Sequence, residues 1–193
     1  MSEQPSGDSL HPESTRGRLL VAAPALLDPN FDKTVVFMLE HSDEGALGLV
    51  LNRPSELPVA GTIDDWASVA AAPPVLFVGG PVSSSSVIAM ATVALDDVGE
   101  GWNETVGRLG TVDLESTPEE VGGIDRVRLF AGFASWAPGQ LEAELVEQAW
   151  FVVDAEEDDV HTHDPDELWW AVVGRQPGEL ARLRNYPRDA SHN

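Results

Sequence analysis

The chain has 193 residues, a length suited to one domain with a buried core. It contains no cysteine, which excludes disulfides, catalytic thiolates, zinc ribbons and iron–sulfur clusters. It carries 33 acidic against 11 basic residues, a formal net charge of −22, and such a surface repels the phosphates of nucleic acids, so a nucleic-acid partner is not expected.

The N-terminal segment and the hydropathy of the chain indicate in which cellular compartment the protein is expected. No apolar run approaches the ~18 residues needed to cross a bilayer. The polar start MSEQPSGDSLHPEST has neither the basic nor the apolar part of a secretory signal. We therefore expect a cytoplasmic protein with no membrane partner. Residues 1–15 have almost nothing to bury and predict a disordered tail, followed by a single domain over residues 16–188 and a short tail over residues 189–193.

Apolar, β-branched runs predict the strands of the first half of the domain, at residues 18–22, 34–40, 46–51 and 75–78. Five residues separate the second and third runs, which favours a hairpin. The proline-containing segment 23–33 predicts a loop, because X-Pro steps resist helix. A helix is predicted from Thr62, with Trp66 on its inner face, and Pro73-Pro74 ends it.

In the second half, strands are predicted at residues 87–95, 126–133 and 150–153, and helices after Thr117 and at residues 138–148, 164–175 and 177–186. The glycine-rich stretch 96–117 is either an inserted loop or a hairpin. Strands and helices do not alternate strictly, as they do in a doubly wound fold. We therefore expect an α+β fold, a single compact domain in which helices flank a mixed β-sheet.

Two loops near the middle of the chain could hold a site. Gly79-Gly80 follows a buried strand, and glycine N–H groups can face an anion. No Gly-Lys-Ser/Thr follows, and Pro81 lacks a donor, so the sequence favours a tight turn that needs glycine. The four serines 83–86 lack the context of a nucleophile elbow, and a flexible polar loop is the favoured interpretation.

Three histidines are weak candidates. His41 ends an apolar strand beside Asp43, so it could be a general base, although a hydrogen-bonded turn residue is the more common role. His161 and His163 lie in an acidic run, where in extended backbone both rings could meet one metal. Such a run is more often a solvated loop, so we expect no dedicated metal site.

The segment that joins the strand 126–133 to the following helix is the strongest site candidate. Trp136 offers an apolar wall, and Gln140 and Glu142 offer polar groups near the start of the helix. This composition suits a pocket or a partner surface. It suits equally well a loop anchored by a buried tryptophan whose N–H is satisfied locally.

Three segments, at residues 17–54, 75–82 and 129–150, taken in this order resemble the AlgH/YqgE family of bacterial proteins, and the resemblance extends over roughly residues 17–188. The matching pieces include His41, Asn52-Arg53-Pro54, Gly79-Gly80-Pro81-Val82, Trp136, Gly139-Gln140-Leu141-Glu142 and Trp150. The resemblance implies a compact cytosolic protein of mixed α and β structure and no established reaction. The chain departs from the family in having Ser135 where a glycine is common before the tryptophan.

Two functions remain open. The first is a non-catalytic binding or regulatory protein whose site combines Asn52-Arg53, Gly79-Gly80 and the segment from Trp136 to Glu142, with Arg53 as the anion contact. The alternative is a hydrolase- or transferase-like enzyme with His41 as base and Arg53 as electrostatic stabiliser. No cofactor is expected. The partner is a small molecule or a protein of unspecified identity, and the oligomeric state stays open.

Overall fold

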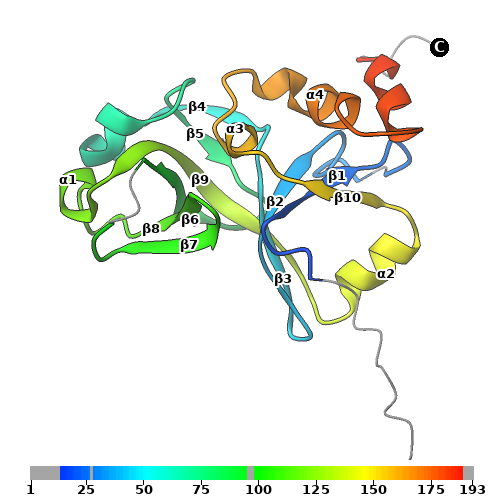
Figure 1. Cartoon of the computed structure of the whole chain (residues 1–193), viewed down its shortest axis with the longest axis horizontal. Coiled ribbons are helices and arrows are strands. Elements are labelled where there is room, and N and C mark those ends of the chain that lie inside the picture. Colours follow the sequence, from blue (N-terminus) through cyan, green and yellow to red (C-terminus); the bar gives the residue numbers. More distant parts are fainter. Residues whose placement is uncertain (1–13, 27, 95–97, 189–193) are drawn as a thin grey trace, which may run out of the picture.

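The computed structural model describes residues 14–26, 28–94 and 98–188. These residues form one ten-stranded sheet, in which eight strands follow the order β10-β1-β2-β3-β9-β6-β8-β7, while β4 pairs with β5 and β5 with β9 (Figure 1). The strands are β1 (Arg18–Ala22), β2 (Val35–Ser42), β3 (Gly45–Val50), β4 (Pro54–Pro58), β5 (Val75–Val78), β6 (Val82–Val93), β7 (Trp102–Val106), β8 (Leu109–Val112), β9 (Ile124–Trp136) and β10 (Trp150–Asp154).

The long strand β9 joins the two halves of the sheet. Its last residues, Ala134 to Trp136, pair with β3, and its preceding residues pair with β6. The two halves diverge from this shared strand, with β4 to β8 on one side and β1, β2 and β10 on the other (Figure 1). All strand pairs are antiparallel except β5 with β9, so the sheet is mixed through one parallel pair in the described chain.

The helical segments are short. They are η1 (Asp64–Val69), α1 (Pro118–Val121), α2 (Gln140–Val146), α3 (Glu157–Val160), η2 (Pro165–Glu167), α4 (Leu168–Gly174) and η3 (Leu180–Asn185), where η denotes a 3-10 helix. Within the described residues, no helix is long and apolar enough to cross a bilayer. The protein is therefore mostly β with a few helices, which is consistent with the expected α+β class in its coarse form.

Strand β1 after Arg18 and the first five residues of β2 are buried on both faces, which explains why these runs are apolar. Leu19 and Phe37 face the core under α4, together with Trp169 of that helix. Leu20 and Met38 face the opposite core, which α2 closes. The other half of the sheet has its own core, built around the fully buried Trp66 of η1.

Most of the predicted strands and helices are present, but several boundaries are wrong. The β2–β3 hairpin turns over two residues, Asp43 and Glu44, because His41 and Ser42 continue β2. The four serines belong to β6, where a wide shift in register between Val82 and Val87 leaves them exposed as a bulge. The sequence did not predict β4. The stretch 96–117 contains the β7–β8 hairpin.

Most of the two expected tails lies outside the described residues. Residues 1–13 and 189–193 lie outside the described residues, as does Leu27 of the loop 23–33. Thr15, at the end of the expected tail, is buried and 2% exposed. Its contacts with His41 therefore make it part of the folded domain.

Candidate functional site

Arg53 follows β3 and lies beside two cavities, of about 300 and 370 Å³, which share Arg53 and Pro54. The first is lined also by Pro29, Asn30, Val50, Val78, Gly80 and Pro81. The second is lined also by Asp32, Lys33, Asn52, Asp166 and Trp170. We call these two spaces the Arg53 cavities. They bring together the segments around Asn52-Arg53 and Gly80, which the sequence expectation placed in one site.

The guanidinium of Arg53 is half-buried and only partly used. Its Nη2 donates to the backbone oxygen of Asp32 at 3.0 Å. Among the described residues, no carboxylate lies within ion-pair distance of Arg53, although the neighbouring Asp32 carboxylate is 3.5 Å from Lys33 Nζ. A guanidinium carries five donors, so Arg53 keeps most of its hydrogen-bonding capacity beside the cavities.

Both polar atoms of the Asn52 side chain are hydrogen-bonded to the backbone. Its Oδ1 accepts from the backbone N of Val35 at 3.0 Å, and its Nδ2 donates to the backbone oxygen of Lys33 at 2.9 Å. The side chain amide thus ties the end of β3 to the loop that precedes β2. It positions Arg53 and lines one cavity with little capacity left for a ligand.

Gly79 and Gly80 lie where the chain passes very close to β9. The N–H of Gly79 donates to the backbone oxygen of Ala131 at 2.9 Å. A Cβ on Gly79 would overlap the backbone oxygen of Gly132, and one on Gly80 would overlap the backbone of Phe133. The glycines therefore permit a close backbone crossing, as the turn interpretation expects, and only Gly80 lines an Arg53 cavity.

Trp136, Gln140 and Glu142 lie at the other end of β3, away from the Arg53 cavities. Trp136 is 5% exposed and packs on Trp150 with ring centroids 6.0 Å apart. The residue that organises this corner is Glu144 of α2, which is half-buried against both tryptophans.

The Glu144 carboxylate accepts hydrogen bonds from both indoles and from Gln140. Trp136 Nε1 and Trp150 Nε1 donate to its Oε2 at 2.9 and 2.8 Å, and Gln140 Nε2 donates to its Oε1 at 3.0 Å. Gln140 Oε1 in turn accepts from the N–H of Ala137 at 3.0 Å. The polar groups of this corner satisfy one another, which corresponds to the anchored-loop interpretation.

His41 is packed between the N-terminal segment and α2. Its side chain is 4% exposed, and its Nε2 lies 2.9 Å from Glu142 Oε1. The N–H of Thr15 donates to His41 Nδ1 at 3.0 Å, so Nδ1 is the acceptor and Nε2 carries the proton donated to Glu142. Both ring nitrogens are thus occupied by protein groups.

His41 and Arg53 do not share a cavity, since Arg53 lines two cavities and His41 lines neither. Val35, at the start of β2, is bonded to Asn52, and His41 lies six residues further along the same strand. At ~3.3 Å per residue the separation is about 20 Å. The shared pocket required by the enzyme alternative is absent from these two spaces.

The His41–Glu142 contact has a measurable pH dependence. The hydrogen bond from His41 holds the pKa of Glu142 below its ordinary value of 4.5. A carboxyl with a lowered pKa in the folded state stabilises the fold above its ordinary pKa, and this contribution is lost as the pH falls through the lowered value. We expect Glu142→Gln to lower the free energy of unfolding by about 1 kcal/mol at pH 7.

The same substitution should have a smaller effect at a pH low enough to protonate Glu142 in the folded parent protein. Urea unfolding at pH 7 and at the lowest pH at which the parent protein stays folded measures both values. An equal loss of stability at the two pH values would contradict the assignment. Glu147→Gln, an exposed position at the end of α2, is the matched control and should change neither.

The acidic run 154–159 forms ion pairs with arginines of four other segments. Its partners are Arg18 with Asp154, Arg108 with Glu157, Arg126 with Asp158, and Arg175 with Asp159. Asp154 thus joins the end of β10 to β1, and the acids of α3 pair with Arg108 before β8, Arg126 of β9 and Arg175 after α4. Asp159 is the most buried of these acids, and both its oxygens lie 2.6 Å from Arg175 nitrogens.

His161 and His163 do not point to one place. His161 is 5% exposed, with Nε2 3.3 Å from the backbone oxygen of Met90 and Nδ1 3.3 Å from Thr92 Oγ1. Burial, with nearby Arg126 and Arg128, lowers its pKa to about 4, so the ring is neutral at pH 7. His163 is exposed. Across the described chain, no group of three or more histidine and acidic side chains is arranged to hold a metal ion.

Two further features of the structure have little or no local signal in the sequence. Arg128 of β9 is 1% exposed, and the only signal for it was a charged residue inside an apolar strand. The second is a cavity of about 400 Å³ between the β2–β3 hairpin and strands β6 to β8, which shares no lining residue with the Arg53 cavities. Its lining residues belong to strands far apart in the sequence, so no local motif marks it.

Comparison with known proteins covers nearly the whole chain. A family model described as AlgH-like matches residues 19–181. A UPF0301 protein of Streptomyces coelicolor is 49% identical over 185 residues, covering 93% of this chain and 96% of the relative. A UPF0301 protein of Mycobacteroides abscessus is 41% identical, covering 92% of this chain and 87% of the relative.

Two solved structures are similar in fold. A crystal structure of a protein from Corynebacterium diphtheriae is 32% identical, with a TM-score of 0.81, covering 93% of this chain and 92% of that one. The solution structure of AlgH from Pseudomonas aeruginosa is 29% identical, with a TM-score of 0.65, covering 96% and 98%. The ordered glycine, proline and tryptophan motifs, the fold and these matches agree: the chain belongs to the AlgH-like family, whose relatives here carry the name UPF0301.

Proposed function

We propose that this protein is a non-catalytic binding protein that recognises a small anion, of the carboxylate class, in the Arg53 cavities. The observation that carries this proposal is a half-buried arginine beside two concave spaces that has no carboxylate partner among the described residues. By contrast, the four arginines that pair with the acidic run donate to its carboxylates at 3.1 Å or less. In a chain of net charge −22, an arginine without such a partner is available to a ligand.

The lining favours a small ligand of low charge. Lys33 provides a second cation in the same space, with its side chain 14% exposed. Asp32 and Asp166 line that space too, and they disfavour a polyphosphate. Val78, which is 46% exposed, and Trp170 offer apolar surface for the body of the ligand. These groups suit a monocarboxylate with an apolar portion.

The other residues of the expected site support this ligand indirectly or not at all. Asn52 holds the loop on which Lys33 lies, and Gly80 forms part of one wall. Trp136, Gln140 and Glu142 are occupied by contacts with Glu144 and His41. The burial of His41 and the engagement of both its nitrogens favour binding over catalysis.

A thermal-shift screen of the full chain against short carboxylates and phosphorylated metabolites tests the proposal. A ligand at ~100 times its dissociation constant adds ~2.7 kcal/mol of stability, a shift easily seen in a domain of this size. Arg53→Gln should weaken the binding of any carboxylate that shifts the transition by at least about tenfold, because a charge-assisted bond is lost.

Arg18→Gln is the matched control, since Arg18 pairs with Asp154 on a different strand. It should leave the ligand-induced shift unchanged. A carboxylate shift that survives Arg53→Gln would remove the site from these cavities. The absence of a shift with every compound would favour a protein partner instead.

A further inference from the structure

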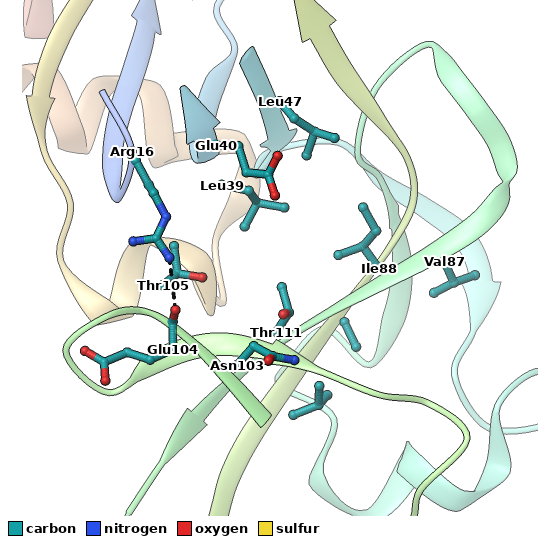
Figure 2. Close-up of a pocket in the computed structure, with 12 residues that line it drawn as sticks. Arg16, Leu39, Glu40, Leu47, Val87, Ile88, Asn103, Glu104, Thr105 and Thr111 are labelled. Atoms are coloured by element: carbon teal, nitrogen blue, oxygen red, sulfur yellow. Dashed lines mark hydrogen bonds between the residues drawn. The ribbon is translucent and has the colours of Figure 1, made fainter. Parts of the chain in front are cut away.

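The cavity of about 400 Å³ is a cleft between two parts of the sheet that are far apart in sequence. Figure 2 shows the end of β2 on one side and strands β6, β7 and β8 on the other. Its apolar lining comprises Leu39, Leu47, Val87, Ile88 and Val112. We call it the hairpin cleft, because the β2–β3 hairpin supplies one wall. Its volume is in the range of small-molecule sites.

A bulge in β2 directs a carboxylate into this cleft. The register of β2 against β3 shifts between Met38 and Glu40, so the strict alternation of side chains is broken there. Leu39 and Glu40, although adjacent in sequence, both line the cleft. Figure 2 shows the Glu40 carboxylate pointing into the space above Leu39. Bulges of this kind commonly redirect a side chain at a functional site.

The Glu40 carboxylate is not neutralised by the protein. Within the part of the chain that the structure describes, it takes part in no ion pair and no side-chain hydrogen bond. Arg16, on the same cleft, donates from Nη2 to the backbone oxygen of Glu104 at 3.0 Å and closes one side against β7 (Figure 2). Arg16 is therefore fixed on β7, and no contact with Glu40 at 4.0 Å or less is formed.

We propose that the hairpin cleft binds a small amphipathic cation, a primary ammonium joined to an aliphatic body. The ammonium pairs with Glu40, and the aliphatic body lies on Leu39, Leu47 and Ile88. The opposite wall carries the polar side chains of Asn103 and Thr111, which line the same space.

The charge of the whole protein favours a cation over an anion at this position. A net charge of −22 raises the local concentration of cations and lowers that of anions. Arg16, the guanidinium that lines the cleft, already donates to a backbone oxygen, whereas the exposed carboxylate of Glu40 has no partner among the described residues. This site is independent of the Arg53 cavities, since the two share no lining residue.

The test uses three probes of one length: n-hexylammonium, n-hexanol and hexanoate. Each is titrated into the full ¹⁵N-labelled chain at pH 7, and amide shifts give both the location and the affinity. Hexylammonium should shift amides of β2, β6 and β7, and bind more tightly than hexanol. Hexanoate should show no saturable shift there. Scattered shifts over the acidic surface, or hexanoate binding in the hairpin cleft more tightly than hexylammonium, would overturn the proposal.

Glu40→Gln separates specific binding from general attraction of cations to an acidic protein. We expect it to weaken hexylammonium by at least about tenfold and to leave hexanol unchanged. Glu56→Gln, which removes an exposed charge on β4, is the matched control and should leave both affinities as they were. Equal weakening by the two variants would show that only net charge matters and would overturn the assignment. Far-ultraviolet circular dichroism checks that both variants are folded.

Discussion

Arg128→Ala is expected to lower the free energy of unfolding by about 4 kcal/mol, a large fraction of the stability of a typical domain. Arg128 is 1% exposed and is one of the largest fully buried side chains. Its guanidinium donates to the backbone oxygens of Ala72, Pro73 and Thr162 at 2.8 to 3.3 Å. The substitution would leave these oxygens without that donor and open a large void.

The arrangement around Arg128 is unusual because the described residues supply no carboxylate partner for the buried cation. Its positive charge is stabilised instead by three carbonyl dipoles and by the face of the Phe77 ring, whose centroid is 4.1 Å from Arg128 Cζ. Burial lowers the pKa of Arg128 to about 10, so the side chain remains charged at pH 7. The side chain joins β9, the segment before β5 and the segment after α3.

Two further variants separate the causes of this loss. Arg128→Met restores most of the buried volume but none of the donors, and should still cost about 2 kcal/mol. Arg128→Lys keeps the charge without the planar fork, and we expect an intermediate loss. Urea unfolding at pH 7 gives all three values. If Arg128→Met were as stable as the parent protein, the carbonyl contacts would contribute nothing, and the account of this residue would be wrong.

Gly79→Ala is expected to destabilise the fold by about 3 kcal/mol or more, because the added methyl group has no space. A Cβ there would overlap the backbone oxygen of Gly132 and touch Phe130. Backbone atoms of a central strand cannot move aside as the end of a flexible side chain can. The clash would also strain the bond from the N–H of Gly79 to Ala131 and the bond from Val50 to the oxygen of Gly79.

Gly174→Ala is the matched control, in which the same methyl group is added at the end of α4. The nearest atom there is the Cβ of Arg184 at 3.4 Å, an ordinary contact. A helical glycine replaced by alanine should raise stability by up to about 1 kcal/mol. Thermal and urea unfolding measure both variants. A Gly79→Ala protein as stable as its parent would show that the glycine serves some purpose other than close packing.

Most of the strands could be located along the chain from sequence, because their signals are local. The apolar runs in β1, in the first five residues of β2 and in β3 mark strands that are largely buried, and glycine and proline turns separate them. The capping box at Thr117 also follows from local chemistry, and the structure shows both of its hydrogen bonds. The short 3-10 character of η1 and the strand β4 were not predicted, because such irregular segments depend on tertiary packing.

The contacts made by the site residues, in contrast, could not be predicted from sequence. Residue types alone could mark Arg53, but they could not show that Glu144 would meet two indoles or that His41 would be enclosed by Thr15 and Glu142. Nor could they show that the acidic run would meet arginines from four other segments. Each of these contacts joins side chains brought close by strand pairing rather than by neighbouring positions.

Local sequence thus specifies which segments become strands, because backbone preference and burial act over a few residues at a time. The folded arrangement alone settles which polar groups satisfy one another and which stay available to a ligand. Among the described residues neither Arg53 nor Glu40 forms an ion pair, and strand register and a bulge place both beside cavities.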